Sequence, residues 1–191
     1  MPETAPVQTS ANTPRSLGVN YLPGSGDMMA YGGIVLFARG VLAYFVQGNP
    51  IFLWMCPIGL VVSAHFYPLI EKGVVRLGAD NRGMFFEGLG VVPWGAIKRV
   101  HHTQRALRTL RLHTMMVELT DAPENVVIDP NPFPAWKRFM AKAWKAHGAV
   151  ITVELHPLAK DPVNLVDQLL AFRPDLLKQV HDDRAASAAN S

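Results

Sequence analysis

Seven histidines are the residues of this chain best suited to metal chemistry, and their spacing does not predict a metal site. His101-His102 and His113 fall in segments predicted to form neighbouring strands. Because adjacent residues of a strand point to opposite faces, at most one of His101 and His102 can join His113. No carboxylate accompanies them at ligand spacing, so we predict surface or interface histidines and no bound metal or cofactor.

Catalysis by a nucleophile has no better support in the sequence. The single cysteine, Cys56, has no Cys or His beside it at motif spacing, and we expect it to contribute to packing. The sequence has no glycine-rich phosphate loop, no Gly-x-Ser-x-Gly elbow and no His-Glu-x-x-His helix. Asp121, Glu124 and Asp129 flank turns, and roles in those turns account for them. We therefore predict a non-enzymatic protein.

A local excess of positive charge is more informative. Between Trp94 and His147, nine Lys and Arg residues stand against four acids. Two interpretations remain open: a solvated positive face, or contact with anionic lipid headgroups, to which each Lys or Arg contributes about 1 kcal/mol. Nucleic-acid binding would need a recognisable module, which this stretch lacks. The cations are Lys98, Arg99, Arg105, Arg108, Arg111, Lys137, Arg138, Lys142 and Lys145.

The last four of these cations lie in a segment, residues 133–147, that predicts an amphipathic helix. This helix would either pack on the domain as a surface helix or lie in the headgroup region with its apolar face down. We expect its residues to contact the membrane or a partner. Its apolar stripe is Trp136, Phe139, Met140, Ala143 and Trp144, at helical spacing, with Lys137, Arg138, Lys142 and Lys145 on the opposite side.

Two long apolar stretches precede the basic segment and would place it relative to a membrane. Residues 28–46 contain one charge, Arg39, and residues 51–70 contain no Asp, Glu, Lys or Arg. A membrane-spanning helix needs about 20 predominantly apolar residues, so the pair predicts a transmembrane hairpin over residues 28–70. The alternative is a buried helical hairpin in a soluble protein, which would need a core partner large enough to cover both helices.

The basic residues predict the orientation of this hairpin. The connection QGNP carries none, whereas Arg15 precedes the first stretch and Lys72, Arg76 and Arg82 follow the second. Basic residues near membrane ends favour the cytoplasmic side. We therefore expect both termini in the cytoplasm.

Arg39 would cost about 2.5–3.5 kcal/mol at the centre of a membrane-spanning helix if it faced lipid. We therefore predict a partner for it; the alternative is that Arg39 lies near enough to the outer end of the helix for its side chain to reach the headgroups. One candidate is the carbonyl of Leu53, since Pro57 cannot donate the helical hydrogen bond to that carbonyl. The other is a carboxylate on another subunit.

The remaining residues predict one small domain with a tail at each end. Residues 1–27 are rich in Pro, Ser, Thr, Asn and Gly and predict a flexible tail, and residues 181–191 predict a disordered one. Residues 72–180 predict about six short strands of a barrel or sandwich. Asp161-Pro162 begins a helix that would cap one end of the barrel. Its apolar stripe is Leu165, Val166, Leu169 and Leu170.

The segment LGADNRGMFFEGLGVVPWGAIKRV resembles a motif of bacterial pleckstrin-homology-like (PH-like) proteins: a strand, a turn with Gly, a strand, and a Pro-Trp-x-x-Ile step into the next strand. IDPNPFPAWKRF, then GAVITVELHPL and the closing helix, resembles the later part of the same group. In the YcxB-like members a two-helix membrane hairpin precedes one PH-like domain. The resemblance implies an α+β membrane protein with a PH-like domain on the cytoplasmic side of a bacterial inner membrane. It supplies no catalytic residues.

Two functional hypotheses follow. The first is a membrane-anchored PH-like module that binds a protein partner or anionic lipid headgroups at the inner membrane. The second is an accessory subunit of a larger integral membrane complex, which would pack against that complex through its transmembrane hairpin.

Overall fold

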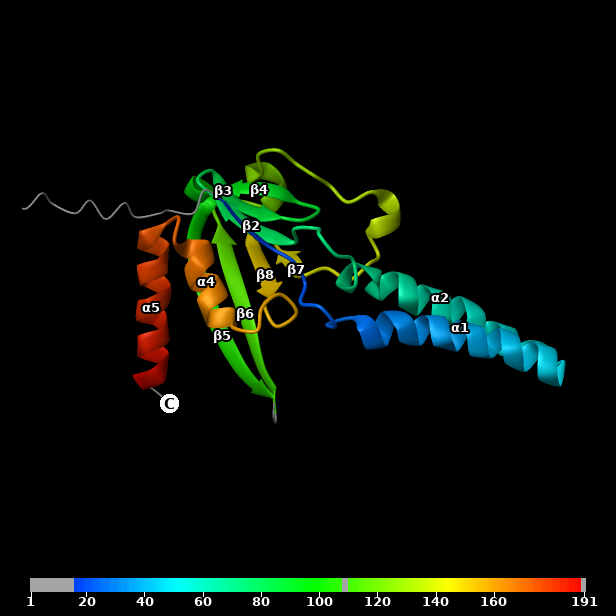
Figure 1. Ribbon diagram of the computed structural model, residues 1–191. Helices are drawn as coiled ribbons and strands as arrows, with labels where there is room; N and C mark the ends of the chain where they lie inside the picture. Colours follow the sequence, from blue (N-terminus) through cyan, green and yellow to red (C-terminus); the bar gives the residue numbers. More distant parts are fainter. Residues whose placement is uncertain (1–15, 108–109, 190–191) are drawn as a thin grey trace, which may run out of the picture.

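The computed structural model describes residues 16–107 and 110–189, with the side chains of residues 16–104 and 112–185. It is an α+β protein in which two long helices project from a domain built of two antiparallel sheets (Figure 1). The predicted α+β class is confirmed. The two sheets are separate and four-stranded, so the domain is not the closed barrel that we considered.

The first sheet has the order β1-β2-β3-β4 and the second the order β5-β6-β8-β7. A short helix, η3 (Trp94–Ala96), joins the two sheets. The strands are β1 (Ser16–Val19), β2 (Leu77–Asp80), β3 (Gly83–Phe86), β4 (Gly90–Pro93), β5 (Ile97–Leu107), β6 (Leu110–Leu119), β7 (Trp144–His147) and β8 (Val150–Glu154).

The helical hairpin is inserted between the first two strands of the first sheet. β1 precedes the hairpin and pairs antiparallel with β2, which follows it, with Ser16 opposite Asp80 and Val19 opposite Leu77. The predicted flexible tail is therefore wrong for residues 16–19; residues 1–15 lie outside the described residues. β1 is ordered because its backbone completes the sheet edge and Leu17 and Val19 pack against the core.

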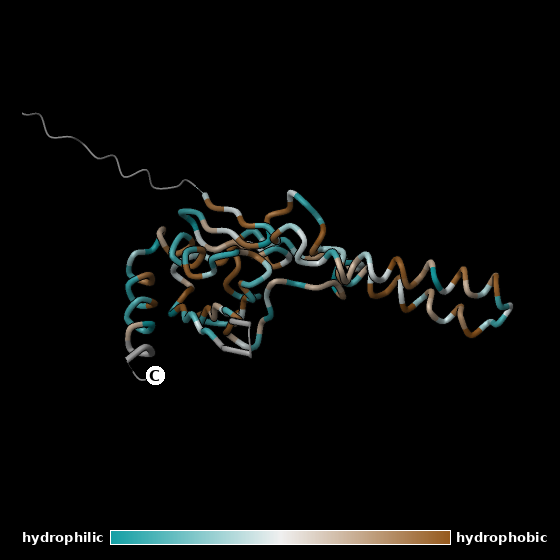
Figure 2. The backbone as a smooth tube through the Cα atoms, turned by 60° about the horizontal axis from the view of Figure 1, so that its bottom comes forward, coloured by the Kyte–Doolittle hydropathy of each residue, from teal (hydrophilic) through white to brown (hydrophobic). Residues whose placement is uncertain are grey.

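The hairpin consists of α1 (Asp27–Gln47) and a second helical stretch formed by η1 (Pro50–Trp54), α2 (Met55–Phe66) and η2 (Tyr67–Leu69). The stretches Asp27–Gln47 and Pro50–Leu69 are long and apolar enough to cross a membrane. Their outward side chains are exposed, as Phe45 is by 77%. Apolar residues line the projecting arm (Figure 2), so the hairpin is not buried in the domain.

The core of the domain lies between the sheets and α4 (Pro162–Leu170). The Asp161 carboxylate accepts a hydrogen bond from the Asn164 N–H and caps this helix, as predicted. The four residues of the predicted stripe on α4 are all buried. The residues with the lowest exposure include Met84, Phe86, Val92, Val100, Met115, Val117, Ile151, Val153 and Leu169.

A last helix, α5 (Pro174–Ala189), follows α4. The predicted disordered tail from residue 181 is therefore wrong over residues 181–189. The helix persists because Leu176 and Val180 are buried against the core. Arg184 and His181 bond Asp167 of α4 at 3.0 and 3.2 Å.

The predicted amphipathic helix over residues 133–147 is wrong. That segment holds only a short helical turn, η4 (Ala135–Lys137), and then the strand β7. Gly148, with φ of +57°, turns β7 into β8, and Trp144 pairs opposite Val153. Because β8 offers an open edge to residues 144–147, backbone pairing there replaces helical hydrogen bonding. Upstream of this segment, α3 (Pro123–Val126) follows β6.

Candidate functional site at the base of the hairpin

Arg76 is a buried charge at the junction between hairpin and domain, and only 2% of its side chain is exposed. Its guanidinium donates to Glu71 at 2.8 Å, to the Pro68 carbonyl at 2.9 Å, and to Glu87. Lys137 adds a second cation at 3.2 Å from Glu71. Two cations and two carboxylates thus form a neutral cluster, which we name the junction cluster.

The junction cluster ties together parts of the chain that are distant in sequence. Pro68 lies in η2 at the end of the hairpin, Glu87 follows β3, and Lys137 belongs to the segment between β6 and β7. Sequence reasoning did not identify it. The one available signal was an acid, Glu71, directly after an apolar span and five residues before Arg76.

Electrostatics keep these groups ionised. Burial opposes the charge on Glu71, but hydrogen bonds from Arg76 and Lys137 outweigh it and hold its pKa below the ordinary value. Burial likewise opposes the charge on Arg76, and its two carboxylate partners raise its pKa. The guanidinium lies 5.2 Å from the centre of the Tyr21 ring, and burial raises the pKa of that phenol to about 12. The charges compensate one another, so we assign the cluster a structural role.

The loop between β6 and β7 also binds the end of α2. The His65 Nδ1–H donates to the Phe139 carbonyl at 2.5 Å, and the Ala141 N–H donates to the His65 carbonyl at 2.8 Å. These bonds hold Trp136 and Phe139 beside the base of the hairpin with 57% and 52% exposure. Two large apolar side chains therefore face outward where the hairpin meets the domain.

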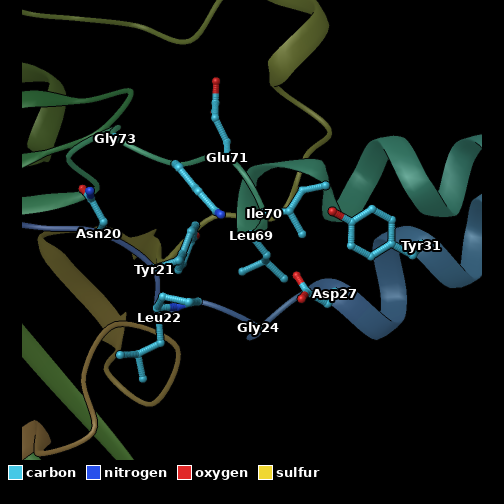
Figure 3. Close-up of a pocket in the computed structure, with 12 residues that line it drawn as sticks. Asn20, Tyr21, Leu22, Gly24, Asp27, Tyr31, Leu69, Ile70, Glu71 and Gly73 are labelled. Carbon is cyan, nitrogen blue, oxygen red and sulfur yellow. The ribbon is translucent and has the colours of Figure 1, made fainter.

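A cavity of about 420 Å³ lies between the two linkers that join the hairpin to the domain (Figure 3). Asp27 and Lys72 line it, both exposed and without a hydrogen-bond or ion-pair partner among the residues that the structure describes. A second cavity, of about 570 Å³, shares Tyr21 and the residues after it and extends to Lys142. The apolar walls of the first cavity come from Leu22, Pro23, Leu69 and Ile70.

The other residues that we assigned to the predicted helix over 133–147 differ in their burial and in their contacts. Met140 is buried, and the Trp144 indole N–H donates to the Glu87 carbonyl at 2.8 Å. Lys142 lies over the Phe133 and Trp144 rings, and Lys145 pairs with Glu154 at 3.4 Å. Among the stripe residues only Trp136, Arg138, Phe139 and Lys145 are exposed.

The cations predicted between Trp94 and Arg111 do not form one surface beside the base of the hairpin. Lys98 and Arg99 are exposed side by side because a bulge near the start of β5 shifts the register between Ile97 and Arg99. This end of β5 lies on the far side of the domain from the hairpin (Figure 1). Arg108 lies outside the described residues, and so do the side chains of Arg105 and Arg111.

Arg39 is exposed on α1, and it makes no hydrogen bond or ion pair with any described residue. The predicted bond to Leu53 is wrong for two reasons. Residues 50–54 form a 3₁₀ helix, and the Met55 N–H that follows it donates to both the Phe52 and the Leu53 carbonyls. In addition, α1 turns Gly40 toward Met55, which leaves Arg39 pointing away from α2.

His102 and His113 form a hydrogen-bonded pair, and this pair belongs to a polar contact between α5 and the second sheet. Arg184 Nε donates to His102 Nδ1 at 3.2 Å, so His102 Nε2 carries the proton and donates to His113 Nδ1 at 3.1 Å. Burial, Arg184 and His113 lower the pKa of His102 to about 4. Among the described residues no group of three or more His, Cys, Asp or Glu side chains could hold a metal ion.

These features define an α+β protein with an apolar helical hairpin inserted into a two-sheet domain. Comparisons with known proteins find no matching family model, no matching curated protein and no matching solved structure.

Proposed function

We propose that this protein is a non-enzymatic, PH-like module anchored by its hairpin in the inner membrane of a bacterium, with both termini in the cytoplasm, and that the base of the hairpin contacts anionic lipid headgroups. The observation that carries the proposal is the exposure of Trp136 and Phe139 beside the end of α2. Trp favours the level of the headgroups, and both Trp and Phe occur on the membrane-facing side of interfacial helices.

Charge at the same place supports headgroup contact. Lys72 follows the hairpin and Arg138 lies between the two exposed aromatics in sequence, and both cations are exposed. Each Lys or Arg near an anionic surface contributes about 1 kcal/mol. Lys137 is held by Glu71 and does not take part in this contact.

The attachment of the domain favours one fixed orientation. The chain enters the hairpin from β1 and returns to β2, and these strands are hydrogen-bonded to each other. The junction cluster adds a buried connection at the same place. A domain held at both ends of its anchor presents the same surface to the bilayer, which a single flexible linker would not achieve.

The test places an environment-sensitive fluorophore beside Trp136 in the full chain, through Ala135→Cys in a Cys56→Ser background. We expect the emission of this label to be blue-shifted in vesicles with anionic lipid relative to neutral vesicles, and we expect the shift to become smaller as salt rises. Lys98→Cys, on the far end of β5, is the matched control and should show no shift. Equal emission from both labels in anionic and neutral vesicles would contradict headgroup contact.

A second candidate function is an accessory subunit of an integral membrane complex. The uncompensated charge of Arg39 on the outward side of α1 favours it. An integral protein that co-purifies in stoichiometric amount from mild detergent would support this role.

A further inference from the structure

We infer that the side of α1 turned away from α2, centred on Arg39, binds a transmembrane helix of a different protein that carries an Asp or Glu at the same depth. This inference deepens the proposed function and rests on membrane insertion of the hairpin.

Arg39 lies close to the middle of α1. At 1.5 Å per residue, it is about 18 Å from Asp27 and about 12 Å from Gln47. A helical side chain leans toward the helix N-terminus, which directs Arg39 away from the nearer end. In a bilayer whose apolar core is about 30 Å thick, neither headgroup layer is close.

The surface around Arg39 has the spacing of a helix-packing seam. We call it the outer face of α1. Its positions are separated by alternating steps of four and three residues, the repeat with which two helices pack at a small crossing angle. Gly32 has open space around it, where a neighbouring backbone could approach closely. The outer face consists of Met28, Gly32, Val35, Arg39, Leu42 and Val46, all exposed.

The hairpin itself cannot neutralise Arg39. Residues 28–70 contain no Asp or Glu. Asp27 begins α1, three helical turns away, and Glu71 is engaged by Arg76 and Lys137. A charge facing lipid at this depth is costly, so a compensating group must come from another chain.

A second copy of this protein does not supply that group. Two copies insert in the same orientation, so their outer faces would meet in parallel with Arg39 opposite Arg39. Like charges at close range in a medium of low dielectric repel strongly. Charge complementarity therefore selects a different protein, whose helix bears a carboxylate.

The test uses the full chain reconstituted in vesicles, with a donor fluorophore on Gln47→Cys in a Cys56→Ser background. The probes are two synthetic Leu-Ala transmembrane helices that carry an acceptor, one with a central Glu and one with Leu at that position. We expect the Glu probe to associate about tenfold more tightly, the scale of one interhelical polar contact. Arg39→Leu should abolish this preference, and Arg39→Lys should retain most of it.

A second arm tests the exclusion of self-pairing. Donor- and acceptor-labelled wild-type copies should show only random energy transfer. A mixture of wild type and Arg39→Glu should associate, because it supplies the missing carboxylate at the same depth.

Three results would overturn the inference: equal binding of both probes, as expected if Arg39 reaches headgroups on its own; pairing of wild-type copies; or an unchanged preference in Arg39→Leu. Carbonate extraction of the same vesicles separates the two proposals. Release of the chain would overturn membrane anchoring as well, whereas retention with equal probe binding would overturn only the present inference.

Discussion

Gly33 of α1 and Gly59 of α2 bring the two helix backbones into direct contact. A Cβ atom built on Gly33 would lie 2.5 Å from the carbonyl oxygen of Gly59, and one built on Gly59 would lie 2.5 Å from the carbonyl oxygen of Gly33. Gly32, one residue earlier, has nothing within 4 Å of such an atom. Adjacent glycines on one helix therefore have opposite roles.

Gly33→Leu should force the helices of the hairpin apart. Overpacking of this kind costs about 1–3 kcal/mol because backbone, rather than a mobile side chain, must move. We expect a lower midpoint of thermal unfolding in mild detergent, followed by circular dichroism. Gly32→Leu is the matched control and should leave the midpoint unchanged, and equal effects of the two variants would contradict the packing.

Arg76→Ala should destabilise the domain by about 3 kcal/mol, since it leaves Glu87 without its buried cation and Glu71 with Lys137 alone. Urea unfolding monitored by circular dichroism measures the change. Arg82→Ala is the control: that side chain is 63% exposed, and its ion pairs with Asp80 and Asp129 are of the surface kind, which contribute at most about 1 kcal/mol. If both variants unfold alike, the junction cluster does not stabilise the fold.

The free energy of unfolding should fall as the pH drops from about 6.5 toward 4. The pKa of His102 is about 4 in the folded chain against an ordinary value of 6.5, so in this interval the unfolded chain binds a proton that the folded chain does not. Stability from this group is fully present above the ordinary pKa and is lost as acid protonates the unfolded state.

Urea unfolding at pH 7 and pH 5 checks this prediction. His102→Gln, which can still accept the bond from Arg184, should show a smaller loss at pH 5 than wild type. His147→Gln, at an exposed position on β7, should behave as wild type does. An unaltered pH dependence in His102→Gln would place the acid sensitivity elsewhere.

Both ends of the hairpin should lie on one side of the membrane, the cytoplasmic side. The β1–β2 pairing requires the first part of this statement, because Ser16 and Asp80 face each other across the sheet. The uncharged turn supports the second part. A fluorescent protein that folds only in the cytoplasm should fluoresce when fused after Ser191 and stay dark when inserted between Gly48 and Asn49. The reverse pattern would contradict the orientation.

Elements that depend on local composition were predictable from the sequence. The helices of the hairpin follow from two long apolar stretches, and Asp161-Pro162 together with the stripe that follows predicts the capped helix α4. In each case the residues that decide the structure are contiguous in the sequence. The helical conformation of residues 28–46 and 51–70 thus needs no knowledge of the rest of the chain.

The aromatic spacing around Trp136 and Trp144 shows where local reasoning fails. The residues fit a helical period, yet residues 144–147 join the edge of β8, a partner that the pattern does not reveal. Likewise, residues 181–189 look like a polar tail, but α5 gains its order from contacts of Val180 with the core and of Arg184 with α4.

The functional residues likewise separate into those that the sequence indicates and those that only the tertiary structure reveals. That Arg39 is the single charge in an apolar stretch is a property of the sequence alone, and the proposal that it needs a partner follows from the cost of charge in lipid. Only the tertiary structure decided that β1 pairs across the hairpin with β2, and that Arg76 is buried between Glu71 and Glu87. Backbone pairing joins Ser16 to Asp80, 64 positions apart, and charge compensation joins Glu71 to Lys137, 66 positions apart. Such contacts depend on the packing of the whole chain rather than on neighbouring residues.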